Sequence, residues 1–350
     1  MNRRTMVLTA AAFCLLTAAR ANSAEGEFRP VVKTFYWFQA GYYSDETNDD
    51  HGSFQFKRAR FGFRGKATPK IGYHLMIEAL DEGVNPKVYQ DWAQYEFDPL
   101  LKVRVGQFKY PFGVEAYPCF VWWKFLNISY ASGMICKELV RKDASAESGY
   151  CRDIGVEASG SYRLDPAYTL RYNLMIFNGN GILQTDNNGY KDVVVAAGLK
   201  TAHGLDLGGA YYFGKFRAVG GTKDYGENGL SLHATWDNKL LQRDFRLQGN
   251  VMLAQYDTAG DEVKPWGFYG LGTWFVLPRV EAGLRYDYFD TDRAPETGKL
   301  RRRTTLQASY HFAAGHWVMA NYEIVDDAFK NTENQFMLIF QVALEACLLK

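Results

Sequence analysis

Several features that define common protein classes are scarce in this sequence. It holds 40 basic and 39 acidic residues, whereas nucleic-acid-binding domains usually carry a basic surplus. Beyond residue 24 it has no run of about 18 apolar residues, the length that a transmembrane helix needs. It has five cysteines, and none forms a C-x-x-C pair or a C-x-x-C-H haem motif. These absences argue against a nucleic-acid-binding protein, a helical membrane protein, and a bound metal or haem.

Enzyme motifs are scarce as well. No glycine-rich phosphate-binding loop follows a predicted strand and opens a helix. Ser309 and His311 share one face of a predicted strand, but any alternating polar face produces such pairs, and no orienting group accompanies them. We therefore predict that the protein is not an enzyme and has no catalytic residues, no metal site and no cofactor.

The first 24 residues have the pattern of a secretory signal peptide. Arg3 and Arg4 form a basic segment, residues 6–16 are mostly apolar, and Ala19-Arg20-Ala21 fits a cleavage site. A transmembrane anchor is the alternative, but the apolar run is too short to span about 30 Å of hydrocarbon. We expect a signal peptide over residues 1–24 and one exported domain over residues 25–350.

What the sequence has in plenty is aromatic residues, glycine and alternating polarity. Aromatic residues make up 16% of the chain, and there are 33 glycines, which is typical of strands, tight turns and aromatic-lined membrane interfaces. Residues 71–79, 168–176 and 280–288 alternate apolar with polar side chains, as β-strands with two unlike faces do. About sixteen strands are expected, over residues 31–40, 53–66, 71–80, 88–97, 101–109, 153–162, 168–177, 193–201, 205–216, 229–237, 244–256, 266–277, 279–290, 302–312, 316–325 and 335–344.

Alternating polarity is compatible with two architectures, and the lengths of the strands and loops distinguish between them. A soluble periplasmic sandwich is one, but strands of about ten residues suit a tilted membrane crossing. Short turns such as 67–70 and 277–279 also alternate with long polar loops such as 41–52 and 178–192. The predicted fold class is all-β, a transmembrane antiparallel β-barrel in the outer membrane of a Gram-negative bacterium. It is closed because hydrocarbon leaves no partner for an open sheet edge, and a barrel of this size encloses water.

One strand ends in an unusual way. Residues 104–115 read RVGQFKYPFGVE, and the alternation stops at Pro111 and Gly113, two strand breakers. About forty residues pass before alternation resumes, and an insertion of that length in a compact fold is usually functional. Exported thiols often pair, and three cysteines lie in or beside this insertion. A disulfide among them is expected, with its pairing left open: Cys119, Cys136 and Cys151.

Four segments resemble motifs of the phosphate-selective porin O and P family. They are FKRARFGFRGK (56–66), RVGQFKYPFG (104–113), CRDIGVEASG (151–160) and MIFNGNG (175–181), and their order agrees with that of the family. The resemblance implies a sixteen-stranded, usually trimeric outer-membrane porin whose third long loop folds into the lumen. On this resemblance residues 111–152 are the expected constriction loop, and an external lid is the alternative. The loop residues singled out are Pro111, Gly113, Lys124, Lys137 and Arg141.

A pore selects solutes by its radius and by the charges that line it. The polar faces of the predicted strands give these pore-lining residues: Arg58, Arg60, Arg64, Lys66, Arg104, Arg171, Arg246, Arg285, Arg303, Glu78, Glu281 and Asp287. Arginine presents planar donors suited to phosphate-like anions. Glu281 and Asp287 share a face with Arg285, however, so opposite charges there can neutralise one another and leave a mild anion preference.

Together these observations predict a passive diffusion channel for small anionic or neutral hydrophilic solutes, with phosphate as a candidate anion. The expected partners are outer-membrane lipid and further copies of the chain in a homotrimer, with no nucleic acid. The alternative is a barrel that sheaths or docks another exported protein such as an electron-transfer cytochrome. Residues 345–350 are expected to continue beyond the last strand. Five aromatic residues are expected at the membrane interfaces: Tyr36, Trp37, Trp266, Trp274 and Trp317.

Overall fold

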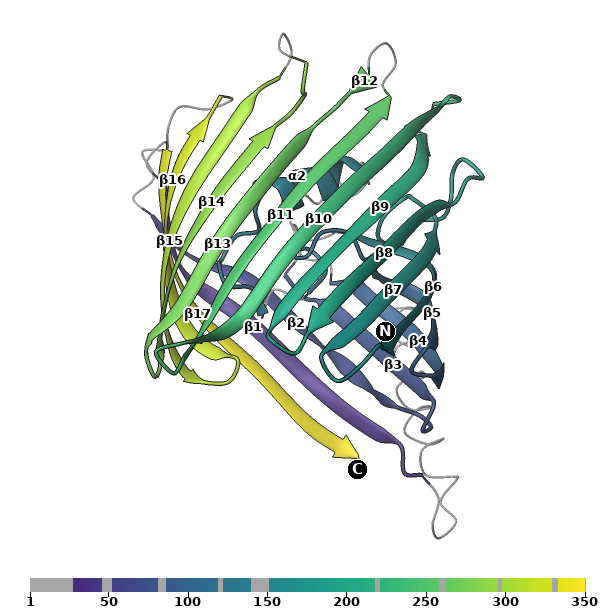
Figure 1. Cartoon of the computed structure of the whole chain (residues 1–350), viewed down its shortest axis with the longest axis horizontal. Coiled ribbons are helices and arrows are strands. Elements are labelled where there is room, and N and C mark those ends of the chain that lie inside the picture. Colours follow the sequence, from purple (N-terminus) through teal and green to yellow (C-terminus); the bar gives the residue numbers. More distant parts are fainter. Residues whose placement is uncertain are drawn as a thin grey trace.

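The strands of the chain pair in antiparallel order around a closed barrel (Figure 1). The computed structural model describes residues 28–45, 52–80, 86–118, 122–139, 151–217, 221–257, 262–294, 298–328 and 333–349. The expected signal peptide lies outside the described residues. Among those residues, no helix is long and apolar enough to cross a membrane.

Seventeen strands and one helix longer than a single turn form the described part of the chain. The helix is α2 (Tyr130–Leu139), which lies in the segment between β5 and β6. The strands are β1 (Val31–Asp45), β2 (Ser53–Lys66), β3 (Ile71–Glu78), β4 (Lys87–Asp98), β5 (Leu101–Lys109), β6 (Arg152–Arg163), β7 (Tyr168–Phe177), β8 (Asp192–Thr201), β9 (Leu205–Arg217), β10 (Asp224–Leu240), β11 (Arg243–Asp257), β12 (Glu262–Val263), β13 (Trp266–Leu277), β14 (Val280–Asp290), β15 (Leu300–Ala313), β16 (His316–Asp327) and β17 (Glu333–Leu349).

The barrel wall has sixteen positions. The two-residue strand β12 and the longer β13 both pair with β11, so the 17 strands of the described chain fill 16 places. Strand β1 pairs with β2 on one side and with β17 on the other, which closes the sheet. Closure satisfies the main-chain donors and acceptors that an open edge would leave in hydrocarbon. The predicted fold class is confirmed.

Alternating residues give the wall two chemically different faces. On β14, Glu281, Arg285 and Asp287 are buried on the inside, whereas Leu284 and Tyr286 are exposed on the outside. The same alternation recurs on the other strands, so the outer face is an apolar surface for lipid and the inner face is polar. The period of two read from the sequence is the direct cause of this sidedness.

Several expectations about the wall are wrong. Strand β1 does not end at residue 40 but continues to Asp45, because Gly41 to Asp45 keep pairing with β17. Strand β17 does not end at Leu344 but continues to Leu349, because Ala346 and Cys347 keep pairing with β1. Strand β10 spans Asp224–Leu240 and not 229–237, since its polar ends also pair with both neighbours. Trp37 and Trp317 are not interfacial anchors, because both face the interior and are almost fully buried.

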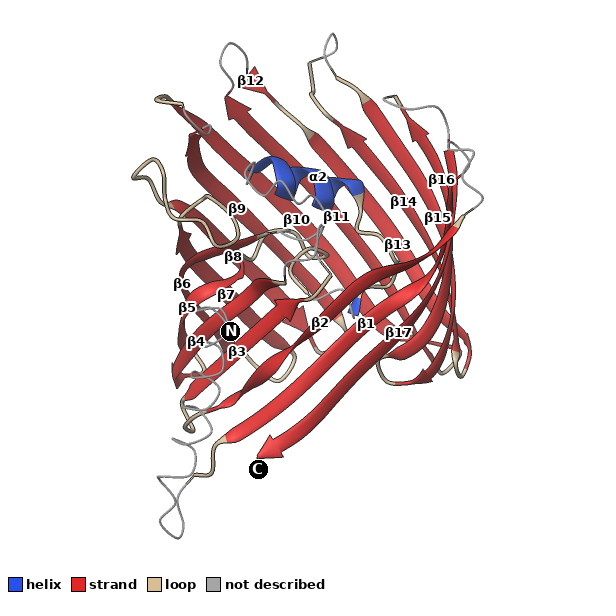
Figure 2. Ribbon diagram, turned by 180° about the vertical axis from the view of Figure 1, so that it is seen from behind, coloured by secondary structure: helices blue, strands red, loops and turns tan. Residues whose placement is uncertain are grey.

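A segment of the chain lies inside the barrel and fills part of it. Figure 2 shows α2 enclosed by the strands, and α2 contacts the inner faces of β10, β11, β13 and β14. The buried apolar residues of this region include Ala131 and Ile135 of α2 together with Met252 and Ala254 of β11. The hydrophobic core therefore lies between the wall and the enclosed segment. We call residues 110–118 and 122–139 the inner segment.

Candidate functional site

The inner segment begins where β5 stops at Lys109. Pro111 has no amide hydrogen for a sheet ladder, and Gly113 adopts φ of 79°, a left-handed conformation that favours glycine. Tyr110 then stacks on Phe177 of β7, with ring centroids 5.0 Å apart and an interplanar angle of 5°. The two strand breakers thus turn the chain off the wall, and the aromatic contact holds it against the inner face.

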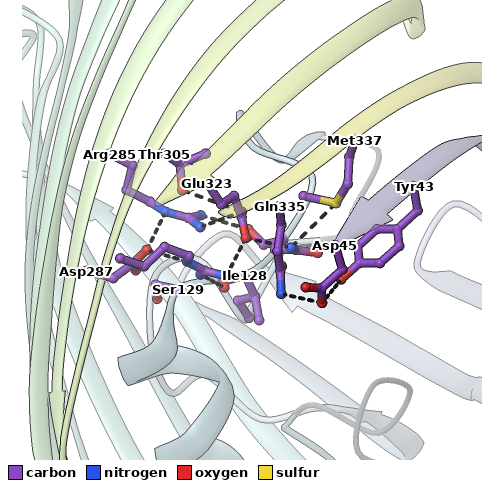
Figure 3. Close-up of polar contacts among 12 residues, drawn as sticks. Tyr43, Asp45, Ile128, Ser129, Arg285, Asp287, Thr305, Glu323, Gln335 and Met337 are labelled. Atoms are coloured by element: carbon purple, nitrogen blue, oxygen red, sulfur yellow. Dashed lines mark hydrogen bonds and ion pairs between the residues drawn. The ribbon is translucent and has the colours of Figure 1, made fainter. Parts of the chain in front are cut away.

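A buried network of charges holds the inner segment against β14, β15 and β16 (Figure 3). Arg285 pairs with Asp287 at 2.9 Å and with Glu115 of the segment at 3.2 Å, and it donates to the main-chain oxygen of Asn127 at 2.7 Å. Each of these groups needs a partner because burial of an isolated charge is costly. Arg285 and Asp287 therefore join wall and segment instead of facing open water.

Arg303 repeats this arrangement on the next strand. It pairs with Asp287 at 3.0 Å and with Glu323 at 3.2 Å, and it donates to the main-chain oxygen of Ile128 at 2.6 Å. Glu323 in turn accepts a hydrogen bond of 3.1 Å from the side chain of Asn127. The two predicted pore-lining arginines on β14 and β15 thus bind main-chain oxygens of the inner segment.

Glu115 is the segment's own contribution to this network. Its carboxylate accepts a hydrogen bond from the Ser129 amide at 2.8 Å and faces Arg285. Burial raises the pKa of Glu115 above its ordinary value, and the Arg285 guanidinium offsets part of that rise. Ser129 also caps α2, because its hydroxyl accepts a hydrogen bond from the Ser132 amide at 3.2 Å. One carboxyl thereby links the turn after β5, the start of α2 and the barrel wall.

Two further contacts attach the segment elsewhere on the wall. Lys124 pairs with Glu281 of β14 at 2.6 Å. Lys57 of β2 donates to the side chain of Asn127 at 2.8 Å. Lys57 and Arg58 both reach the interior because the β1–β2 register shifts between Gln39 and Ala40. Parity alone could not assign Lys57 to the inner face, and it was missed in the sequence for that reason.

A disulfide joins α2 to the start of β6. Its partners are Cys136 and Cys151, which are separated by 15 positions in the chain. Cys119 and Arg141 lie outside the described residues, as does the side chain of Lys137. Cys347 lies on β17.

The other predicted pore-lining charges lie on the inner face and have varied partners. Arg60 pairs with Glu78 at 2.6 Å and is buried, whereas Lys66 is exposed and binds the Pro69 carbonyl at a turn. Arg171 pairs with Asp206, and Arg246 pairs with Asp237 at 2.6 Å. Arg58 donates to Gln39 at 3.0 Å, and its guanidinium lies over the ring of Trp123. Most of these cations are therefore matched by a carboxylate.

Three cavities among the described residues lie between the inner segment and the wall. One of about 170 Å³ includes Arg171 and Asp206, and one of about 520 Å³ includes Lys124, Arg246, Asp237 and Glu281. The third, of about 220 Å³, is lined by Trp37, Arg64, His74, Met76, Gln90, Trp92, Arg104, Lys109, Tyr117 and Trp122. The lining of this third cavity, as described, contains basic residues and no carboxylate. We call it the cationic cavity.

Ser309 and His311 lie close together, but their geometry is not that of a catalytic triad. The Ser309 hydroxyl and the Glu281 carboxylate both contact Nε2 of His311, at 3.0 and 3.3 Å. A triad needs the acid on one ring nitrogen and the nucleophile on the other. Within the described residues there is also no cluster of three or more side chains suited to a metal ion.

An apolar outer face, a polar interior and a closed sheet of sixteen positions together define an outer-membrane porin. The chain belongs to the phosphate-selective porin O and P family, whose sequence profile matches residues 33–242. It resides in the outer membrane of a Gram-negative bacterium. No curated protein matches the sequence.

Solved structures share the fold at low sequence identity. An anion-selective porin from Comamonas acidovorans is 13% identical, covering 90% of this chain and all of its own, with a TM-score of 0.66. OmpT of Vibrio cholerae in its trimer form is 12% identical, covering 90% of this chain and 99% of its own, with a TM-score of 0.63. The outer-membrane channel DcaP of Acinetobacter baumannii is 11% identical, covering 92% and 99%, with a TM-score of 0.61.

Proposed function

We propose that the protein is a passive diffusion channel for small hydrophilic solutes that passes anions in preference to cations. The observation that carries the proposal is the uneven distribution of charge among the cavities inside the barrel. In two of the three cavities cations and carboxylates line the same space, whereas the described lining of the cationic cavity includes Arg64 and Arg104 and no carboxylate. A solute that passes this part of the wall meets a positive potential.

The environment of Arg64 strengthens this reading of the cationic cavity. Arg64 and Lys33 share the one carboxylate of Glu345, so two cations are balanced by a single negative charge. Arg104 lies 3.7 Å from Glu157 and is otherwise held by the neutral amide of Gln94. The inner segment contributes Tyr117 and Trp122 to the lining of the same cavity, and this supports a permeation route beside Arg64 and Arg104.

Single-channel recording in planar bilayers under a KCl gradient tests the proposal. We expect a steady conductance with a reversal potential directed toward chloride. In the variant Arg64→Gln that potential should move toward zero, because one of the two cations at Glu345 is removed. Arg246→Gln is the matched control, because it removes an arginine that Asp237 already neutralises. The net charge lining the 520 Å³ cavity then becomes more negative. The reversal potential should therefore shift by a different amount than in Arg64→Gln.

The outcomes separate the candidate functions. A cation-directed potential in the wild-type protein would contradict the anion preference. No conductance from a barrel that still shows heat-modifiable migration would contradict the channel itself and point to the sheath or docking role. Inorganic phosphate that lowers the chloride current at low concentration would extend the proposal from anions in general to phosphate.

We also propose that the barrel assembles as a homotrimer. The support is the trimer form of OmpT, which shares the fold with a TM-score of 0.63. Light scattering of the detergent-purified protein should give a mass of three copies. A monomeric mass that persists after reconstitution and gentle extraction would contradict the trimer.

A further inference from the structure

We propose that the cationic cavity is a binding site for small aromatic carboxylates, recognised by Arg104, Arg64 and Trp122. The inference rests on the proposed function, since such a solute reaches the cavity through the lumen. The cavity measures about 220 Å³, below the range of sites for drug-sized ligands, so it fits a single-ring compound.

A row of aromatic rings fixes the cavity's back wall. Phe35 stacks on Trp37 at 4.3 Å and on His74 at 5.4 Å, and His74 stacks on Trp92 at 5.5 Å with an interplanar angle of 7°. The row ends at the Arg104 guanidinium, which lies 4.6 Å from the centre of the Trp92 ring. Stacked rings of this kind leave little rotational freedom, so the wall is rigid.

Arg104 is held in an orientation suited to a carboxylate. Its guanidinium lies near two aromatic rings, Trp92 at 4.6 Å and Phe108 at 5.0 Å. Contact through the ring faces leaves the in-plane N–H groups for hydrogen bonds, and Gln94 accepts from Nε at 3.3 Å and from one terminal nitrogen at 3.2 Å. Arg64 lines the same cavity, so a bound carboxylate lies near two arginines, although each of them also faces one carboxylate of the protein, Glu345 for Arg64 and Glu157 for Arg104.

Trp122 supplies the surface for the ligand's ring. It comes from the inner segment, lines the cavity, and is 61% exposed although its neighbour Trp123 is buried. A large indole in contact with water is unfavourable, and a planar apolar ring that covers it gains both burial and stacking. Inorganic phosphate offers no surface for Trp122, and a neutral sugar offers no charge for the arginines. An aromatic carboxylate satisfies both groups at once.

The test compares how several small molecules block the chloride current through the wild-type channel. The probes are sodium benzoate, sodium acetate, benzamide and inorganic phosphate. We expect benzoate to half-block at a concentration about three- to tenfold below that of acetate, which is the range that one aromatic stacking contact supplies. Benzamide, which lacks the charge, should not block at these concentrations.

Two variants identify the site. In Trp122→Leu, the concentration of benzoate that half-blocks the current should rise to that of acetate. Because Trp122 is exposed, the substitution should leave the folding of the barrel unchanged. Phe275→Leu is the matched control, since Phe275 lines the 520 Å³ cavity that carries charges of both signs. It should leave the benzoate-to-acetate ratio at the wild-type value. Equal blocking by benzoate and acetate in the wild-type protein would overturn the proposal. So would an equal loss of the preference for benzoate in Trp122→Leu and Phe275→Leu.

A binding measurement separates this inference from the channel proposal. Equilibrium dialysis of radiolabelled benzoate against the detergent-purified protein needs no current. If Trp122→Leu abolishes benzoate binding and Phe275→Leu preserves it, the site is supported even if the barrel does not conduct. An anion-selective current together with no benzoate binding overturns the site and leaves the channel proposal standing.

Discussion

At the scale of single residues, Arg285 organises the interior more than any other charge described. It is fully buried, and it contacts Asp287 on its own strand, Glu115 on the inner segment and a main-chain oxygen of that segment. The sequence assigned Arg285 and Asp287 to the inner face and expected them to neutralise one another. It could not identify Glu115 as the third member, because that contact joins residues 170 positions apart.

Replacing Arg285 with leucine should strongly destabilise the barrel. The change leaves the buried carboxylate of Glu115 without its cation and leaves Asp287 with Arg303 alone, and breaking a buried pair in this way costs about 3–5 kcal/mol. The measurement is the temperature at which the folded band disappears in heat-modifiable gel migration. Arg246→Leu provides the comparison, since its ion pair with Asp237 is partly exposed and such pairs contribute about 0–1 kcal/mol. Equal shifts in the two variants would contradict the role given to Arg285.

Glu115 should make stability depend on pH. Its pKa in the folded protein lies above the ordinary value of 4.5, mainly because of burial. The folded state therefore binds the proton more tightly than the unfolded state, so this contribution to stability is complete below pH 4.5 and declines as pH rises through the folded pKa. The melting temperature of Glu115→Gln should fall less than that of the wild type over this window. A melting temperature that rises with pH in the wild type, and does not do so in Glu115→Gln, would contradict the raised pKa of Glu115.

At the scale of elements, the strands could be predicted because each carries its own signal, an alternation of period two. Ten predicted strands match to within one residue at both ends, among them β2, β5 and β13. β17 is longer than predicted because Glu345 faces inward, in register with the preceding inward positions, and pairs with Lys33 and Arg64. The path of the inner segment could not be predicted in the same way, because side chains of distant strands determine it.

The disulfide should restrict the inner segment more than the wall. Cys136 and Cys151 close a short loop, and a cross-link over about 15 residues is worth roughly 3 kcal/mol in the chain-entropy account. We expect the double variant Cys136→Ser, Cys151→Ser to keep a folded barrel and to show larger fluctuations of the open-channel current. Cys347→Ser is the control. A double variant with current noise equal to that of the control would show that other contacts alone hold the segment.

At the scale of the whole molecule, the two faces of the wall face two different solvents. Leu284 of β14 is 53% exposed on the outer face, whereas Asn173 of β7 lines a cavity inside. A sequence shows this sidedness well, because one residue of each pair along a strand is apolar. It does not show how far the lumen is filled, since that depends on where the inner segment lies.

A charge should be tolerated on one face and not on the other. Leu284→Arg should lower the yield and stability of barrels folded into lipid vesicles, because a cation facing lipid near the midplane costs about 2–4 kcal/mol. Asn173→Arg, which places the same side chain in a water-accessible cavity, should fold almost as well as the wild type. The readout is the folded fraction on a cold gel after a urea titration. Similar losses in both variants would contradict the assignment of the two faces.

The contacts that hold the inner segment against the wall have a consequence for folding. Lys124 binds Glu281 and Asn127 binds Glu323, contacts that span 157 and 196 positions of the chain. The segment belongs to the first half of the polypeptide, but the groups that hold it belong to β14 and β16 near its C-terminal end. These contacts can form only when β14 and β16 are part of the wall. The interior therefore acquires its final shape late in folding, because it depends on contacts between distant parts of the chain.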